Sequence, residues 1–189
     1  MTAFAGDHAL NPDYDPAERE DEFRRAAVLI AVADFDGEAR VLLTQRTAHL
    51  SSHSGQIAFP GGKIDGDETA VEAALREADE EVGLRGAEVL GEFGSYFSGS
   101  GYEIVPVVAV LSAPPRLTLN EDEVADAFWV PLAFLMDQSS HLIESRTFKG
   151  NERFFYAMPY DDAGTQRRIW GVTAGIIRTV QERLYGVAR

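Results

Sequence analysis

The acidic run LREADEEVGL, at residues 75–84, holds the side chains of this sequence that are best suited to chemistry. Glu77, Glu80 and Glu81 lie close together in a segment that also has the apolar spacing of a helix. Like charges three or four positions apart on a helix repel by about 0.2–0.5 kcal/mol per pair. Carboxylate oxygens at this spacing suit Mg²⁺ or Mn²⁺, which would relieve the repulsion. The run therefore indicates a divalent-metal site, and a solvated helix face without a function is the alternative.

The residues around this run predict a helix over residues 70–82. Thr69 and Glu72 form a capping box, which would start the helix at Ala70. Gly83 supplies the stop at the other end, because glycine tolerates the left-handed conformation that ends many helices.

The angular spacing sorts the side chains of this helix into separate faces. At about 100° per residue, Glu77, Glu80 and Glu81 converge on one flank. Because converging carboxylates raise one another's pKa unless a cation lies among them, metal is expected to bind there. The face expected to be buried consists of Val71, Ala74, Leu75, Ala78 and Val82. Ala70 and Ala73 are expected to leave space beside Glu77 for something bulky.

A glycine-rich turn, FPGGK at residues 59–63, precedes the helix. Gly61 and Gly62 would let the backbone approach a ligand closely. From residue 62 to residue 84 the fixed positions follow G-x5-E-x7-R-E-U-x-E-E-x-G-U, in which U is apolar. This pattern resembles the signature of the Nudix hydrolases, carried here by Gly62, Glu68, Arg76, Glu77, Glu80, Glu81 and Gly83.

The resemblance implies a mixed α/β fold of the Nudix type, an α/β/α sandwich whose signature forms a loop–helix–loop. It also implies hydrolysis of a nucleoside diphosphate linked to another moiety, with Mg²⁺ or Mn²⁺ as cofactor. The implied metal ligands are Glu77, Glu80 and Glu81, with a carbonyl from the Gly61 region. The implied structural supports of the motif are Glu68, Arg76 and Gly83.

A second stretch, LLTQRTAHLSSHSGQIAFPGG at residues 42–62, resembles the additional motif of the coenzyme A pyrophosphatase branch. That motif reads roughly LLT-x-R-[ST]-x3-R-x3-G-x3-FPGG, and IWGVTAGII at residues 169–177 is also similar to that branch. The implied reaction converts CoA or an acyl-CoA to 3′,5′-ADP and 4′-phosphopantetheine or its acyl form. The substrate-binding residues expected from the motif are Arg46, Gly62 and Ser51. Ser51 stands where the motif has its second Arg, whose role could pass to His49 or His53.

A carboxylate must also accept a proton from the attacking water. Glu77 and Glu80 can serve from within the signature. Outside it, Glu123 in NEDEV is preferred because the neighbouring Val124 would anchor it to the core. The other outside candidates are Glu121, Asp122 and Glu103, and an acidic loop without a catalytic role is the alternative for all of them.

Composition limits the remaining possibilities. The 189 residues are 45% apolar and 25% charged, as in an ordinary soluble domain, and the formal net charge is −14. Such a charge disfavours nucleic acid and anionic membranes as partners and fits a small-molecule substrate whose charge metal ions neutralise. Cys is absent, which excludes disulfides and thiolate sites. No apolar stretch is long enough to span a bilayer, so a cytoplasmic location is expected.

The chain is expected to have an acidic, loosely ordered arm at residues 1–24 and a single Nudix domain at residues 25–189. Asp36-Gly37 predicts a hairpin turn. Strands are expected at residues 26–34, 39–46, 55–62, 87–97, 103–111 and 127–131, with a second hairpin at 141–160 and a helix at 171–185. Pro106 argues for an edge strand or a bulge at 103–111.

Two other readings remain open at this point. The missing Arg at position 51 allows a Nudix hydrolase that acts on ADP-ribose, NADH or a (d)NTP instead. A non-catalytic nucleotide-binding module is the alternative from another class, although a pure binder has no need of three repelling carboxylates. A homodimer is suggested only by the family resemblance.

Overall fold

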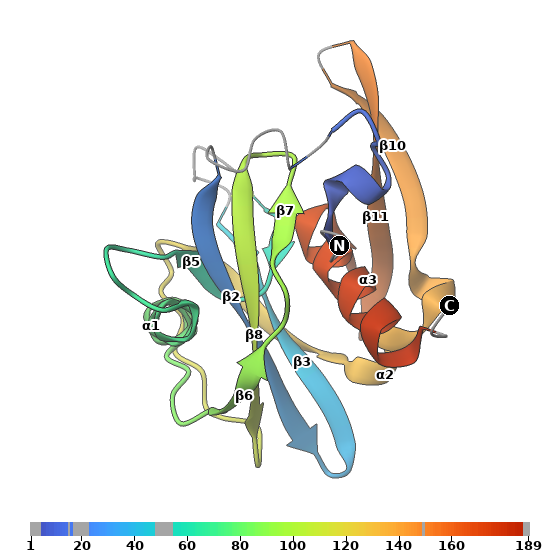
Figure 1. The fold of residues 1–189 in the computed structure, drawn as a ribbon. Coiled ribbons are helices and arrows are strands. Elements are labelled where there is room, and N and C mark those ends of the chain that lie inside the picture. Colours follow the sequence, from blue (N-terminus) through green and yellow to red (C-terminus); the bar gives the residue numbers. More distant parts are fainter. Residues whose placement is uncertain (1–4, 15, 17–22, 48–54, 149, 187–189) are drawn as a thin grey trace.

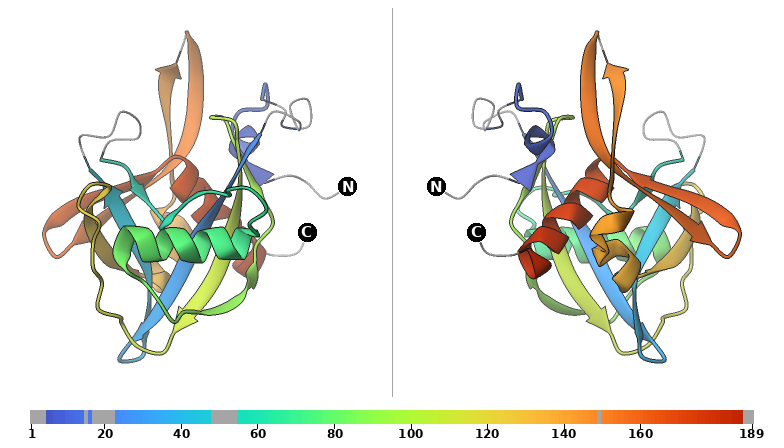
Figure 2. Two further views of the ribbon diagram at one scale, coloured as in Figure 1. Left: turned by 90° about the vertical axis from the view of Figure 1, so that its left-hand side faces the viewer. Right: turned by 90° about the vertical axis from the view of Figure 1, so that its right-hand side faces the viewer.

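The structure is a computed structural model, and it describes residues 5–14, 16, 23–47, 55–148 and 150–186. It confirms the predicted mixed α/β sandwich. A mixed sheet lies between helix α1 (Ala70–Val82) on one face and helix α3 (Val172–Tyr185) on the other (Figures 1 and 2). A smaller antiparallel sheet packs against α3 and closes that side of the molecule.

Strand β2 (Arg24–Phe35) explains why the layers stack in this way. Its sequence is almost continuously apolar, which is typical of a strand buried on both faces. Ala27 and Leu29 belong to the apolar cluster under α1, whereas Ala26 and Ile30 belong to the cluster shared with α3. Alternate residues of one strand therefore supply two separate cores.

One edge of β2 pairs in parallel with β8 (Tyr102–Leu111) along most of its length. Its other edge is divided between β5 (Gly61–Lys63) at its start and β3 (Glu38–Arg46) at its end. The predicted hairpin turn between β2 and β3 is confirmed, with positive φ at Asp36 (53°) and Gly37 (91°).

The remaining elements complete the two sheets. The main sheet also contains β1 (Ala5–Gly6), β4 (Ile57–Ala58), β6 (Glu88–Glu92), β7 (Tyr96–Ser98) and β9 (Val124–Pro131). The small sheet contains β10 (Leu142–Phe148), β11 (Asn151–Asp162) and β12 (Thr165–Trp170). The short helices are η1 (Asp7–Ala9), α2 (Leu132–Met136) and η3 (Gln138–Ser140). Within the described ranges, no helix is long and apolar enough to cross a membrane.

The structure corrects the expectation for Pro106. Strand β8 is central rather than an edge, because β2 lies on one side and β6 and β7 lie on the other. The Pro106 carbonyl accepts a hydrogen bond from the Phe93 N–H (2.8 Å), in the gap between β6 and β7. An N–H at position 106 would point to the same gap, so proline removes no bond from the ladder with β2. The predicted strand at 87–97 is correspondingly two strands.

The buried face of α1 also differs from the expectation. Ala70 and Ala73 are packed in the core at 5% and 0% exposure, so they leave no space for a ligand. Val71 and Leu75 are only partly buried. Because the alanines are small, α1 can lie close to the sheet. The buried face therefore lies nearer to Glu77 than expected, and it includes Glu81.

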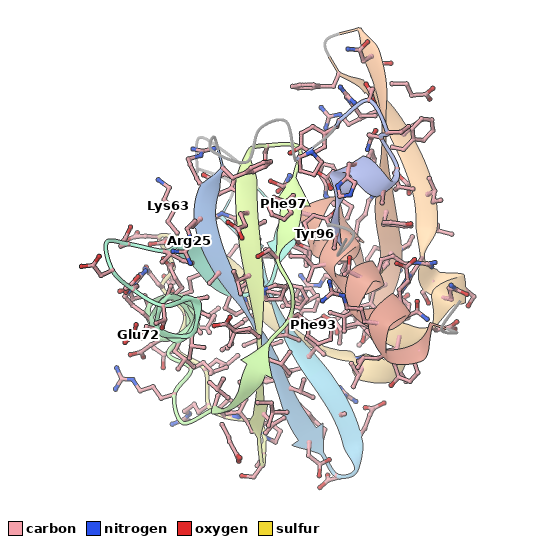
Figure 3. The ribbon with its side chains drawn as sticks, viewed as in Figure 1. Arg25, Lys63, Glu72, Phe93, Tyr96 and Phe97 are labelled. Carbon is pink, nitrogen blue, oxygen red and sulfur yellow. The ribbon has the colours of Figure 1, made fainter. Side chains whose placement is uncertain are left out.

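Residues 5–14 of the segment expected to form a loose arm lie against the domain. β1 pairs with β7, and the Asn11 amide exchanges hydrogen bonds with the backbone of Phe154. The Tyr96 hydroxyl, on the α3 side of β7, donates to Asp7 (2.6 Å) (Figure 3). A few polar contacts made by an aperiodic segment carry no periodic sequence signal, so pattern reading missed them.

Candidate active site

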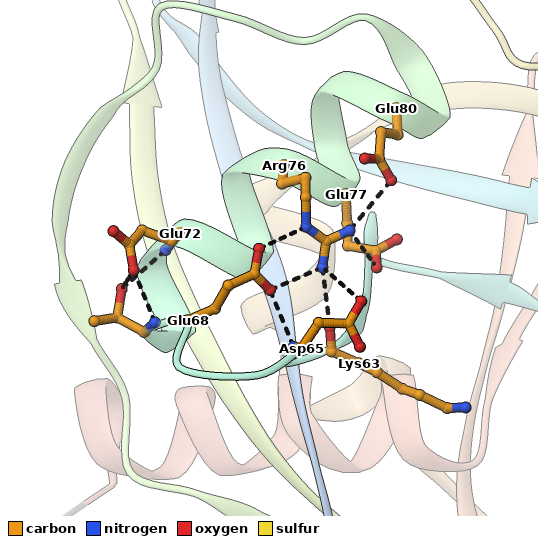
Figure 4. A network of polar contacts seen from close by, with 8 residues as sticks. Lys63, Asp65, Glu68, Glu72, Arg76, Glu77 and Glu80 are labelled. Carbon is orange, nitrogen blue, oxygen red and sulfur yellow. Dashed lines mark hydrogen bonds and ion pairs between the residues drawn. The ribbon is translucent and has the colours of Figure 1, made fainter.

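Helix α1 begins and ends where the sequence predicts. The Thr69 hydroxyl accepts from the Glu72 N–H, and the Glu72 carboxylate accepts from the Thr69 N–H in return (Figure 4). Gly83 has φ = 67°, and the Leu84 N–H donates to the Ala78 carbonyl. These contacts satisfy backbone groups that a helix end otherwise leaves unpaired. They fix the residues at which α1 begins and ends.

Arg76 is the hub of the polar network along α1 (Figure 4). Its guanidinium donates twice to Glu68, at 2.8 and 3.0 Å, and once to the Lys63 carbonyl at 3.1 Å. It also donates to Glu77 at 3.0 Å and to Glu80 at 3.2 Å. The bond to Arg76 lowers the pKa of Glu68. Arg76 thus ties the loop between β5 and α1 to the helix, as the structural role predicted for it requires.

This role gives a first prediction. Arg76→Lys should lower the thermal midpoint by several degrees, because a lysine cannot make the forked contact with Glu68 and still reach Glu77 and Glu80. Differential scanning fluorimetry would measure the shift. Arg85→Lys is the matched control, since Arg85 pairs with Asp79 in solvent at 80% exposure and should leave the midpoint unchanged. Equal shifts in the two variants would contradict the bracing role.

Glu81 is the most unusual side chain of the site. It is 3% exposed, and burial raises its pKa to about 8. Arg46, whose guanidinium lies 3.6 Å from Oε1, and the backbone of Gly61 act in the opposite direction, while Glu77 and Glu123 add to the rise. Its Oε2 has no hydrogen-bond partner among the described residues. A buried carboxylate oxygen without a donor is rare and costly, which makes Glu81 a candidate for a functional role.

Glu77 lies beside Glu81 and shares its electrostatic environment. Burial raises the pKa of Glu77, Arg76 lowers it, and the charges of Glu80 and Glu123 raise it further. A Cβ atom at Gly62 would stand 2.3 Å from Oε1 of Glu77. Glycine at position 62 leaves room for this carboxylate in its observed position.

The strand end on the other side of the site positions Arg46 and Glu123. A bulge between Gln45 and Arg46 shifts the pairing of β3 with β9, and the Thr47 N–H donates to the Glu123 carbonyl (3.0 Å). Of the outside candidates for the base, Glu123 is the one whose charge acts on both Glu77 and Glu81.

The other outside candidates have different surroundings. Glu103 accepts from the Ser95 hydroxyl (2.7 Å), while Glu121 and Asp122 remain in the loop before β9. Three further candidates for substrate binding, Ser51, His49 and His53, lie outside the described residues.

The chemistry of the donor set fits a divalent cation. No group of three Asp, Glu or His side chains in the described part of the chain is already drawn together as a metal cage, and Glu80 is 57% exposed and held by Arg76. However, Glu77 and Glu81 both have pKa values raised by burial, and no described group donates to Oε2 of Glu81. A cation would satisfy that oxygen and favour the ionised form of both carboxylates.

One residue near the site was not found from the sequence. Arg167 on β12 donates to Gln45 (2.8 Å), Asp126 (2.5 Å) and Asp162 (3.2 Å), and it lies over the ring of Phe128. It joins the small sheet to β3 and β9 next to the bulge at Arg46. A turn signal at residues 161–164, followed by a short run ending in Ile169 and Trp170, could have revealed β12.

Comparisons with known proteins find relatives of this chain. The sequence profile described as the NUDIX domain matches residues 23–149. An uncharacterised Nudix hydrolase, NudL of Escherichia coli K12, is 40% identical over 162 residues, which is 82% of this chain and 80% of the relative. A NudL from Photorhabdus laumondii is 38% identical over 174 residues, which is 89% of each chain.

Solved structures show the same fold. The Nudix hydrolase RenU from M. smegmatis gives a TM-score of 0.52 at 30% identity, over 60% of this chain and 74% of that chain. The Nudix domain of NrtR from Shewanella oneidensis, solved with ADP-ribose, gives a TM-score of 0.53 at 21% identity, over 93% and 97% of the two chains.

Proposed function

Because this chain belongs to the Nudix hydrolase family, we propose that it hydrolyses the diphosphate of coenzyme A or an acyl-CoA. Family membership supports the coarser statement, which is hydrolysis of a nucleoside diphosphate derivative with a divalent metal ion. The proposal adds the substrate, the products 3′,5′-ADP and 4′-phosphopantetheine or its acyl form, and Mg²⁺ or Mn²⁺ as the ion.

The single observation that carries the proposal is the position of Arg46. This residue belongs to the motif at residues 42–62 that resembles the coenzyme A pyrophosphatase branch. Its guanidinium lies 3.6 Å from Glu81 of the Nudix signature, and its side chain keeps 28% exposure. A planar, always charged fork at this place suits a phosphate oxygen of the substrate. Two stretches separated in the sequence thus contribute to one site.

Each residue of the site then has a defined task. Glu77, Glu80, Glu81 and the Gly61 carbonyl would hold the ion, which supplies positive charge against the diphosphate and lowers the pKa of water. Arg46 binds a phosphate oxygen and holds the diphosphate in line for attack. Glu123, near Glu77 and Glu81, accepts a proton from the attacking water. The oxygen of that water forms a bond to one phosphorus, and the bridging oxygen leaves with the other phosphate.

A substrate screen tests the proposal. Incubation of CoA with Mg²⁺ or Mn²⁺ should release 3′,5′-ADP, measured by chromatography, and a chelator should stop the release. A protein that leaves CoA intact but cleaves ADP-ribose, NADH or a nucleoside triphosphate would move the assignment to the alternative Nudix substrates. Binding of nucleotide without hydrolysis of any of these compounds would favour the non-catalytic module.

A matched pair of arginine variants tests the role of Arg46. Arg46→Ala should raise KM for CoA by about ten- to hundred-fold, because a charge-assisted contact to phosphate is lost. Arg40→Ala is the control on the same strand, since Arg40 pairs with Glu38 and lies over the Phe35 ring near the hairpin turn, and it should leave the kinetics unchanged. An unchanged KM in the Arg46 variant would remove Arg46 from the substrate site.

A further inference from the structure

Strand β10 (Leu142–Phe148) has an open edge. It is the outer strand of the small sheet, next to β11, and no described strand pairs with its other side. Figures 1 and 2 show the hairpin of β10 and β11 extending beyond the body of the molecule. Large apolar side chains are exposed on β10, with Leu142 at 44%, Ile143 at 58% and Phe148 at 53%. An exposed apolar edge strand is a template for pairing with another chain.

The hydrogen bonds of β11 show which backbone groups it directs toward β10. The Tyr156 carbonyl accepts from the Gly171 N–H, on the β12 side of β11. Phe154, two residues earlier, exchanges hydrogen bonds with the side chain of Asn11. Alternate residues of a strand direct their N–H and C=O groups to opposite sides. Arg153, Phe155 and Ala157 therefore direct theirs toward β10.

This alternation shows which backbone N–H and C=O groups of β10 point away from β11. Phe155 pairs with Glu144, and Arg153 pairs with Arg146, so Glu144 and Arg146 direct their backbone groups toward β11. The N–H and C=O groups directed away from the small sheet are those of Ile143, Ser145 and Thr147. A second strand can pair with this edge only in a register that brings these residues together.

Two copies of β10 complement each other in one such register. An antiparallel arrangement centred on Ser145 places Glu144 opposite Arg146 of the second copy, twice. It also places Leu142 opposite Phe148. The neighbouring registers, centred on Glu144 or on Arg146, would place that residue opposite its own copy, so like charges would meet. The charges of β10 therefore select the register centred on Ser145.

The contacts within one chain leave Glu144 and Arg146 able to pair with a second copy. No described carboxylate pairs with Arg146, which lies opposite Arg153, and Arg153 pairs with Asp13 instead (3.0 Å). Glu144 pairs with Arg168 through Oε2. No ion pair among the described residues uses the other oxygen, Oε1 of Glu144. This oxygen can therefore accept a hydrogen bond from Arg146 of a second copy.

We propose that this protein forms a homodimer in which β10 pairs antiparallel with β10 of a second copy, about a two-fold axis at Ser145. The two small sheets then become one continuous sheet. A two-fold axis makes each contact occur twice, so one strand of mixed charge supplies both halves of the interface.

A charge exchange tests both the interface and its register. Sedimentation velocity from micromolar to hundred-micromolar concentration should show a dimer for the unaltered chain. Arg146→Glu should raise the dissociation constant by about ten- to hundred-fold, because two attractive pairs become repulsive. Combining it with Glu144→Arg should restore the dimer, since the opposite charges meet again with their signs reversed.

Controls separate this result from other effects of charge. Arg116→Glu makes the same change in charge on an exposed loop and should leave the dimer intact. Circular dichroism checks that each variant is folded. A monomer at every concentration, or a dimer that survives Arg146→Glu, would overturn the proposal. A double variant that is folded but stays monomeric would overturn the register centred on Ser145.

Discussion

Glu81→Gln should abolish hydrolysis and yet make the metal-free protein more stable at neutral pH. The loss of activity follows from removing a carboxylate that would hold the metal ion. The gain in stability follows from burial, because Glu81 is 3% exposed, Oε2 lacks a partner in the described residues, and the pKa is raised to about 8. An amide of nearly the same shape carries no charge to desolvate.

The sign of the pH dependence can be worked out. The pKa of Glu81 in the folded protein lies above its ordinary value of 4.5, so the folded state holds its proton more tightly than the unfolded chain does. The stability linked to this proton is fully present below about pH 4.5 and is lost as the pH rises to about 8. The loss at pH 7 is on the order of 3 kcal/mol. In Glu81→Gln this contribution to the pH dependence should be absent.

Urea unfolding with a chelator present, at pH 5 and pH 8, measures this effect. The unaltered chain should lose more stability between the two pH values than Glu81→Gln does. Glu80→Gln is the matched control, because Glu80 is 57% exposed and lies one position earlier on the same helix. Glu80→Gln should behave like the unaltered chain. A Glu81→Gln variant that is less stable than the unaltered chain at pH 8 would show that Glu81 is satisfied in the folded protein.

The adjacent glycines of the turn should respond to the same substitution in opposite ways. A Cβ at Gly61 would stand 2.4 Å from the Ala27 carbonyl oxygen and 2.7 Å from the Val28 Cα, and φ is +157°. These atoms belong to the central strand β2 and cannot move aside. Gly61→Ala should therefore cost at least about 3 kcal/mol of unfolding free energy, from overpacking and backbone strain together.

Gly62→Ala should instead spare the fold and impair the chemistry. The atom that its Cβ would meet is the carboxylate of Glu77, the far end of a flexible side chain. Moving that carboxylate by about 1 Å should lower kcat by roughly a hundred-fold with a change in stability below about 1 kcal/mol. Urea unfolding and CoA turnover, measured on both variants, separate the two effects. Full activity in Gly62→Ala would show that Glu77 does not need its observed position.

The parts of the fold that follow local rules could be predicted from the sequence. The capping box at Thr69, the stop at Gly83 and the turn at Asp36-Gly37 each depend on a few neighbouring residues, and the structure confirms all three. Pro106 could not be placed correctly, because its position depends on where β6 ends and β7 begins on a different part of the chain. The packing of Asn11 against Phe154 spans even more of the sequence.

The candidate site divides in the same way. Periodicity correctly puts Glu77, Glu80 and Glu81 on one helix, but it cannot say how each is covered. Glu81 is buried beside Gly61 of β5 and Arg46 of β3, while Glu80 stays in solvent. Arg46 approaches Glu81 where the pairing of β3 with β9 skips Ala125, an irregularity that leaves no signal in the residue pattern.

Arg76 has a consequence for the protein when divalent metal ions are scarce. Its guanidinium contacts Glu77 and Glu80, so the protein carries its own counter-ion for these carboxylates. A metal ion that binds to these carboxylates must displace the Arg76 guanidinium. The apparent affinity for the ion then reflects the difference between the free energies with which the ion and Arg76 bind the carboxylates. When metal is scarce, we expect the protein to stay folded but inactive, and to regain activity when the ion returns.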